Sequence, residues 1–163
     1  MPKTPHLLPT DVKEVVEKNL KFLETQIREN HIIVIKHYES SLPMVMADAG
    51  MLYQAFLNIF MNAMQTMENG GKIEVDASTN KQSIILTFKD SGKGIPPEVL
   101  SKVWDPFFTT KETGSGLGLG IVRNIIKSHD GEVSIANRPE GGAVVTLILP
   151  SSKGERDGND IDR

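Results

Sequence analysis

The chain is organised around the stretch Lys89-Asp90-Ser91-Gly92-Lys93-Gly94-Ile95. The residues just before it, SIILTF at 83–88, are β-branched and apolar, which predicts a strand that ends at a polar, glycine-containing loop. Glycines in such a loop permit positive φ angles and let a ligand approach the main chain closely. The stretch therefore predicts a fixed carboxylate, Asp90, beside a surface on which a flat ring could lie. The alternative is an ordinary strand-to-loop turn that contains an aspartate.

Length and composition describe an ordinary soluble domain. The 163 residues suit one domain, since domains commonly span about 100–200 residues. The chain has no cysteine, which excludes a disulfide scaffold, a thiol nucleophile and a thiolate metal site. A net charge of −3 without a basic cluster argues against nucleic acid as the main partner. No signal peptide or membrane span is visible, so we expect a cytoplasmic location and leave open whether a parent protein is membrane-anchored.

Hydrophobic periodicity divides the chain into helices and strands. Apolar residues at three- and four-residue steps predict helices over 11–29, 48–68 and 119–129, with a short helix near 98–102. Strands are predicted over 72–79, 83–89, 132–137 and 143–149. The β-branched run 32–35 predicts a strand covered on both faces, and 44–46 a short edge strand. This pattern predicts an α/β two-layer sandwich, with a mixed, mainly antiparallel sheet of about five strands packed on about three helices.

The two ends of the chain differ in composition from the rest. The first ten residues contain three prolines, and the last thirteen, 151–163, are polar and charged. We therefore assign residues 1–9 to a flexible lead-in, 10–150 to the folded domain and 151–163 to a disordered tail.

The helix predicted over 48–68 carries a line of amides. Gln54, Asn58, Asn62 and Gln65 follow one another at steps of four, four and three, which places them along one flank of an otherwise apolar helix. Asparagine oxygens suit Mg²⁺, which takes few protein ligands and completes its shell with phosphates and water. We interpret the line as a half-buried polar groove; solvated surface amides are the alternative.

A run of alternating glycines, Gly114-Ser115-Gly116-Leu117-Gly118-Leu119-Gly120, leads into the helix over 119–129. The free backbone N–H groups of a helix start attract phosphate. The spacing matches neither the Rossmann nor the phosphate-loop pattern, so the run is a phosphate-binding candidate of a third kind, with a flexible linker as the alternative. Upstream, Phe107-Phe108-Thr109-Thr110-Lys111 has the mixture of a segment that closes over a ligand. Alternatively, Phe107 is a core residue and Lys111 is solvated.

In this order, these stretches resemble the ATP-binding catalytic domain of bacterial sensor histidine kinases, within the wider GHKL ATPase family. Residues 58–63 (NIFMNA) are similar to its N box and 90–94 (DSGKG) to its first glycine box. Residues 105–111 (DPFFTTK) resemble its F box, in a form like that of nitrogen-regulator kinases, and 114–119 (GSGLGL) its second glycine box. Residues 141–150 are similar to its last strand, so the resemblance covers about 10–150.

The resemblance implies roles for individual residues. Asp90 would accept a hydrogen bond from the adenine amino group with Thr146 in support, and Asn62 would hold Mg²⁺ against the phosphates. Residues 96–116 would form a short lid over ATP. The implied catalytic residues are Asn58, Asn62 and Lys111. The implied nucleotide-binding residues are Asn58, Asn62, Gln65, Asp90, Gly92, Gly94, Ile95, Phe108, Thr109, Thr110, Lys111, Gly114, Ser115, Gly116, Leu117, Gly118, Leu119 and Thr146.

The chain departs from the family pattern in two places. Many members carry a basic residue and an aromatic where Gln65-Thr66 stand here, which shifts the role of a phosphate-binding cation to Lys111. The phosphorylated histidine of a kinase is followed by an acidic residue and soon after by a proline. None of His6, His31, His37 and His129 has that setting, and His129 is interpreted as a cap or packing residue.

The resemblance therefore implies a kinase domain without its acceptor. We expect it to bind ATP or ADP with Mg²⁺ and to phosphorylate a histidine on a dimerisation domain of its own parent protein or of a partner, with a response regulator downstream. The isolated domain is expected to be monomeric. A GHKL-type ATPase is disfavoured because such enzymes carry a glutamate that activates water where Asn58 stands, and an amide cannot take that proton. A non-catalytic nucleotide-sensing module is the remaining alternative.

Overall fold

The computed structural model describes residues 4–104 and 118–151 and contains one five-stranded sheet. The strands lie in the order β2 (Ile32–Tyr38), β4 (Gly71–Asn80), β5 (Ser83–Asp90), β7 (Ala143–Pro150) and β6 (Glu132–Asn137). Only the β2–β4 pair is parallel, and the other three pairs are antiparallel. The predicted mixed, mainly antiparallel sheet is confirmed.

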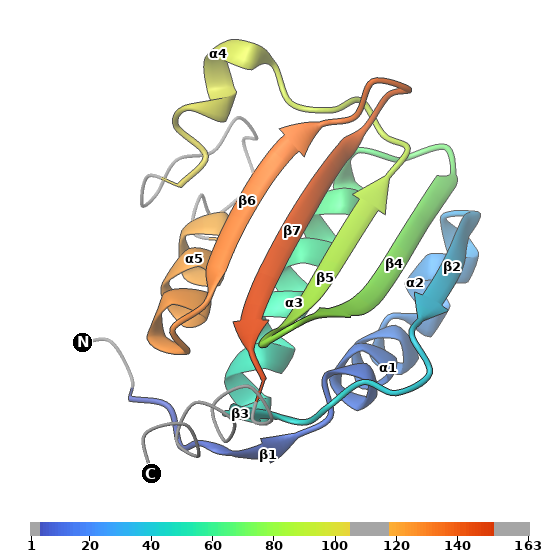
Figure 1. Ribbon diagram of the computed structural model, residues 1–163. Helices are drawn as coiled ribbons and strands as arrows, with labels where there is room; N and C mark the ends of the chain where they lie inside the picture. Colours follow the sequence, from blue (N-terminus) through green and yellow to red (C-terminus); the bar gives the residue numbers. More distant parts are fainter. Residues whose placement is uncertain (1–3, 105–117, 152–163) are drawn as a thin grey trace, which may run out of the picture.

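The helices cover one face of this sheet (Figure 1). Five helices are present in the described residues instead of about three: α1 (Val12–Phe22), α2 (Glu24–Glu29), α3 (Ala49–Gln65), α4 (Pro97–Leu100) and α5 (Gly118–Ser128). The single helix predicted over 11–29 is divided at Leu23, whose backbone angles (φ −90°, ψ 3°) leave the helical range. None of the helices in the described part of the chain has the length and apolarity that a membrane crossing requires.

A small second sheet corrects the prediction for the N-terminal lead-in and contains the short strand predicted near 44–46. Strand β1 (Leu8–Thr10) pairs antiparallel with β3 (Val45–Ala47), so part of the predicted lead-in is ordered and the strand near 44–46 lies outside the main sheet. The Thr10 hydroxyl donates to the Ala47 carbonyl at 3.1 Å and adds a side-chain bond to the pair.

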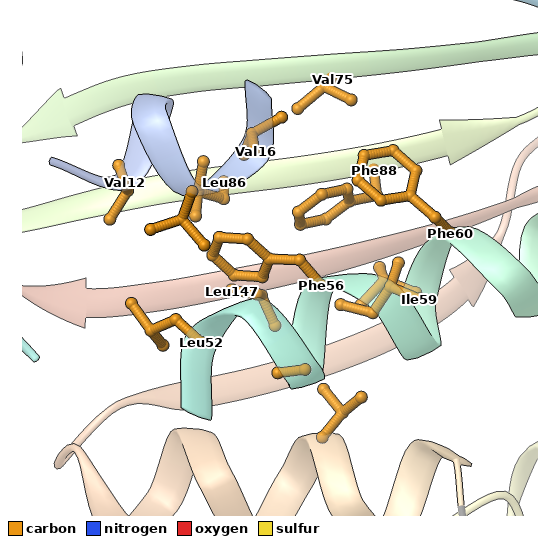
Figure 2. Packing of buried hydrophobic residues seen from close by; sticks show 14 of the residues in the cluster. Val12, Val16, Leu52, Phe56, Ile59, Phe60, Val75, Leu86, Phe88 and Leu147 are labelled. Carbon is orange, nitrogen blue, oxygen red and sulfur yellow. The ribbon is translucent and has the colours of Figure 1, made fainter. Parts of the chain in front are cut away.

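The core lies between α3, α1 and the sheet (Figure 2). Burial alternates along β5 and β7, because one face of each strand packs on the helices while the other faces solvent. Phe88 of β5 meets two phenylalanines of α3, with its ring centroid 5.5 Å from that of Phe56 and 5.4 Å from that of Phe60. These aromatic contacts fix α3 over the middle of the sheet.

The prediction that residues 32–35 are covered on both faces is wrong. The side chain of Ile33 is 64% exposed, because β2 is an edge strand and the described helices leave one face of the sheet open. A β-branched run can serve an open face as well as a buried one, so composition alone did not distinguish them.

The N-terminal end of α3 is fixed by side chains. Asp48 caps its N-terminus by accepting from the Met51 N–H at 3.1 Å. The buried His129, just after α5, accepts from the Asp48 N–H through Nε2 at 3.0 Å, and its Nδ1 lies 2.7 Å from the Ile125 carbonyl. His129 is thus a packing residue that ties the end of α5 to the start of α3, in line with its interpretation as a cap or packing residue.

Candidate nucleotide-binding site

A cavity of about 280 Å³ lies between the C-terminal half of α3, the sheet and the segment 94–103. Its floor is apolar and its rim carries a few polar groups, which is the usual composition of a small-molecule site. The polar and glycine residues that line it include Asn58, Asn62, Gln65, Thr66, Asp90, Gly94 and Gly118, and the apolar ones include Phe88, Ile95, Val99, Val103, Leu119, Ile135 and Val145.

Asp90 is the one acidic side chain among the described residues of the lining. It ends β5 on the helix-covered face and is only 8% exposed. Its Oδ1 accepts from the backbone N–H of Gly92 at 2.9 Å and of Ala143 at 3.2 Å. Its Oδ2 has no hydrogen-bond partner among the described residues. This atom is not fully buried, so a ligand in the cavity can reach it. One oxygen thus anchors the side chain, while the other remains available as an acceptor for a ligand.

Burial raises the pKa of Asp90 above its ordinary value, and this effect outweighs three opposing ones. The hydrogen bonds from Gly92 and Ala143 and the positive charge of Arg138 each lower the pKa. The carboxylate therefore carries a desolvation penalty when it is ionised. A buried acceptor that is kept despite such a penalty is typical of functional sites.

Glycines bring the main chain close to this carboxylate. At Gly142 the φ angle is +88°, and a Cβ atom would collide with the carbonyl group of Asp90. At Gly92 a Cβ atom would collide with the Thr66 side chain at the end of α3. Glycine is thus required at Gly92, in the loop after β5, and at Gly142, just before β7, because the chain packs closely around Asp90 at both positions.

Comparison with known proteins gives the context of this cavity. Residues 47–153 match the family described as histidine kinase-, DNA gyrase B-, and HSP90-like ATPases. The chain belongs to this family. The match spans the whole of the cavity as described above, from α3 to β7.

Several relatives of the chain are named as sporulation kinases or as sensor histidine kinases. The chain is 35% identical over 140 residues to sporulation kinase A of Bacillus subtilis. The aligned region covers 86% of this chain and 23% of that protein. It also resembles the catalytic domain of the histidine kinase ThkA, with a TM-score of 0.82, 31% identity and coverage of 90% of this chain and 96% of that one. The predicted resemblance to such catalytic domains is confirmed. The chain spans about a quarter to a third of the length of the curated relatives that it matches.

Two further solved structures show related kinases with a ligand or partner. The kinase ShkA in complex with AMPPNP has a TM-score of 0.81 and 26% identity, and covers 93% of this chain and 32% of that one. ThkA in complex with the response regulator TrrA has a TM-score of 0.78 and 29% identity, and covers 91% of this chain and 42% of that one.

The two asparagines of α3 lie at the cavity together with the start of α5. Asn58 and Asn62 are half-buried in the lining, whereas Gln65 lines the rim with an exposed side chain. A Cβ atom added at Gly118 would lie 3.2 Å from Nδ2 of Asn62, so the amide contacts the first turn of α5. Gln54 is exposed and outside the lining, so the predicted polar groove holds three of the four amides.

The metal-binding groups at this end of the cavity are amide oxygens. They fit Mg²⁺ that is also bound by phosphates better than a metal ion bound by protein side chains alone. Within residues 4–104 and 118–151, no group of three or more His, Cys, Asp or Glu side chains is arranged so that it could hold a metal ion. Asparagine oxygens can complete an Mg²⁺ shell whose other ligands are phosphates and water. The residues present therefore fit a metal that arrives with a nucleotide.

The predicted support of Asp90 by Thr146 is wrong. In the register of β5 and β7, Thr146 pairs with Thr87, and both side chains point to the open face of the sheet. Asp90 points to the helix-covered face, where Ala143 takes the supporting position through its backbone N–H. Successive side chains of a strand alternate between faces, so a shift of three residues places the hydroxyl on the wrong side.

Several predicted site residues lie outside the described part of the chain. These are Phe108, Thr109, Thr110, Lys111, Gly114, Ser115, Gly116 and Leu117, and with them most of the predicted lid. Gly94, Ile95, Gly118 and Leu119 line the cavity as predicted, and Gly92 lies beside it next to Asp90.

Three residues that act on the loop of Asp90 were not predicted from the sequence as site residues. Asn137 and Arg138, from the end of β6, bond to Ile95 and Asp90, and Thr66 packs over Gly92. Asn137 and Arg138 lie at a polar turn before the last strand and Thr66 lies at the end of a helix, and neither neighbourhood gave an indication of these contacts.

Proposed function

We propose that this chain is the catalytic domain of a histidine kinase, which binds Mg-ATP and donates its γ-phosphoryl group to a histidine outside the chain. The observation that carries the proposal is the hydrogen bonding of Asp90: two backbone N–H groups hold Oδ1, and Oδ2 has no partner among the described residues. An open carboxylate oxygen in an apolar cavity is suited to an exocyclic amino group such as that of adenine. Membership of an ATPase family supports a nucleotide as the ligand.

Phosphoryl transfer requires mainly that the protein positions the reacting groups and stabilises the charge on the phosphates. Asp90 and the apolar floor would orient the base, and the N-terminus of α5 would direct backbone N–H groups toward the phosphates. Asn62 would hold Mg²⁺, which offsets negative charge on the phosphates, and Asn58 would help to polarise the site. Lys111 and the residues 114–117, which lie outside the described part, would add a cation and further phosphate contacts.

A kinase is favoured over a hydrolase by the amide at position 58. Asn58 faces the cavity where the related ATPases carry a glutamate, and an amide cannot accept a proton from water. The nucleophile would therefore be the imidazole of an added histidine. It would come from a dimerisation domain of the parent protein or of a partner, and a response regulator would receive the phosphoryl group afterwards. The complex of ThkA with TrrA supports such a downstream partner.

Phosphoryl transfer to an added domain tests this proposal. With γ-labelled ATP and Mg²⁺, we expect the chain alone to hydrolyse ATP slowly and to remain unlabelled. Adding the helical, histidine-bearing domain of the parent protein should produce an acid-labile, base-stable label on that domain. A variant of the added domain that lacks the histidine serves as control. Rapid hydrolysis without transfer would favour an ATPase, and binding without either would favour a sensing module.

The magnesium role of Asn62 gives a separate prediction. Asn62→Ala should lower the Mg²⁺-dependent transfer rate by roughly ten- to hundredfold, as losses at metal sites commonly do. Binding of ADP in the presence of EDTA should change much less. Gln54→Ala is the matched control, because Gln54 lies on the same helix but outside the cavity. Equal loss of binding with and without Mg²⁺ would contradict the metal role. Rate assays and calorimetric titrations measure the two effects.

A further inference from the structure

The turn between β6 and β7 reaches the wall of the cavity from a distant part of the sequence. It is closed by its own backbone bonds, Arg138 N–H to Gly142 O at 2.8 Å and Gly141 N–H to Arg138 O at 3.1 Å. Figure 1 shows this turn beside the loop that leaves β5. The two residues that start the turn, Asn137 and Arg138, each make side-chain bonds to the backbone of that loop.

Asn137 holds Ile95 at both of its backbone groups. Its Oδ1 accepts from the Ile95 N–H at 2.7 Å, and its Nδ2 donates to the Ile95 carbonyl at 2.6 Å. Only one orientation of the amide satisfies both bonds. Ile95 lies in the segment 94–103 that lines the cavity, so this two-point contact fixes where that part of the wall stands.

Arg138 holds the backbone of Asp90. Its Nη1 donates to the Asp90 carbonyl at 2.8 Å, and its side chain is only 15% exposed. Its Nε pairs with Glu140 at 3.2 Å, on the side of the guanidinium that faces solvent. The positive charge also lowers the pKa of Asp90 against the effect of burial, which favours the ionised acceptor.

We propose that Asn137 and Arg138 are positioning residues for base recognition. Arg138 fixes the main chain of the acceptor Asp90, and Asn137 fixes Ile95 in the facing wall. The β6–β7 turn thereby sets the gap in which the base lies, and selects a ring with an exocyclic amino group over one with a carbonyl in its place. This inference rests on the proposed nucleotide-binding function and adds the residues that determine its specificity.

The test compares ADP with IDP, which differ in whether the base carries an amino group or a carbonyl at that position. Dissociation constants of the Mg²⁺ complexes are measured by calorimetry for the chain and for Asn137→Asp and Arg138→Met. Asn137→Asp keeps the shape but places an acceptor against the Ile95 carbonyl. We expect each variant to lose roughly tenfold in ADP affinity and much less in IDP affinity, since one or two net hydrogen bonds are lost. Glu140→Gln, on the solvent side of Arg138, should leave both affinities unchanged.

A second readout separates positioning from a general loss of structure. In Arg138→Met, the pH below which the affinity for ADP falls should be higher than in the unaltered chain, because the pKa of Asp90 rises when the cation is removed. Arg138→Lys keeps the positive charge, so it should restore the pH at which ADP binding weakens. It loses the planar guanidinium donor, so it should restore only part of the preference for ADP over IDP. The register neighbours of Asp90, Ile73 on β4 and Ala143 on β7, carry no charge, and Lys89 pairs with Asp76 on the opposite face. The nucleotide's own phosphate titrates alike in every variant.

The possible failures are distinct. If the unaltered chain binds neither nucleotide, the proposed function itself is wrong. If it prefers ADP and both variants keep that preference, the positioning role is wrong and nucleotide binding stands. If ADP and IDP affinities fall together in proportion to a lowered melting temperature, the two residues are merely structural, which also overturns the inference.

Discussion

Replacing Asp90 by asparagine is expected to lower the affinity for Mg-ADP by about a hundredfold without destabilising the fold. Asparagine keeps Oδ1 as the acceptor for the Gly92 and Ala143 N–H groups, whose bonds anchor the side chain. It replaces Oδ2 by an NH₂ group, so a donor faces the amino group of adenine. Loss of a hydrogen bond to a charged acceptor is worth about 1.5–3 kcal/mol.

The stability part of this prediction follows from the pKa of Asp90. Burial raises that pKa in the folded state, so the protonated, neutral form of Asp90 is the one that the fold favours. Its contribution to stability is fully present below the unfolded-state pKa and is lost as the pH rises through the folded-state pKa. A neutral isostere avoids the desolvation penalty at neutral pH. The melting temperature of Asp90→Asn at pH 7 should therefore equal or exceed that of the unaltered chain.

The same pKa sets the pH dependence of nucleotide binding. Adenine recognition requires the unprotonated carboxylate, so ADP binding should weaken as the pH falls through the raised pKa of Asp90, beginning above the range of an ordinary aspartate. Calorimetry from pH 7.5 to 4.5 measures this. Asp76→Asn, a carboxylate on the opposite face of the sheet, is the control and should bind like the unaltered chain. Full ADP affinity in Asp90→Asn would show that the base lies elsewhere.

Truncating Phe56 to alanine is expected to lower the free energy of unfolding by about 3–5 kcal/mol. The side chain is fully buried between α3 and the sheet and packs against the Phe88 ring at 5.5 Å. Phe56 does not line the cavity, whereas Phe60 and Phe88 do, so it tests the core separately from the site. Since domains are stable by about 5–15 kcal/mol, the loss is a large part of the total.

Guanidinium denaturation followed by circular dichroism measures this loss. Phe22→Ala is the matched control: Phe22 is 63% exposed on α1 and makes an edge-to-face ring contact with Tyr53, with ring centroids 6.5 Å apart. Its truncation should cost about 1 kcal/mol or less. Comparable losses in the two variants would contradict the assignment of Phe56 to the centre of the core.

Some features of this protein follow from residues that are close in the sequence. The stripe of α3, the alternation of β5 and β7 and the loop after Asp90 are encoded by local periodicity and turn residues, so the two-layer fold was predictable. Asn58 and Asn62 lie one helical turn apart, and any helix at that position presents them together. For the same reason, the order of the boxes was sufficient to predict the family.

Other features depend on pairings between distant segments, which local patterns do not encode. The sheet face to which Thr146 or Ala143 points depends on the register of β7, and that register is set by pairing with β5. The exposure of Ile33 follows from the edge position of β2, and β1 exists only because β3 lies beside it.

The sequence by itself determined the fold class, the family and the acceptor Asp90, because each is written in a short, contiguous pattern. The tertiary structure alone decided how the acceptor is held. Ala143 and Arg138 stand 53 and 48 residues from Asp90, and they reach it only because β7 pairs with β5 and the β6–β7 turn folds over the end of that strand. In each of these bonds one partner is a backbone group, the Ala143 N–H or the Asp90 carbonyl, and such groups occur throughout the chain, so no residue type in the sequence marks the pairing in advance.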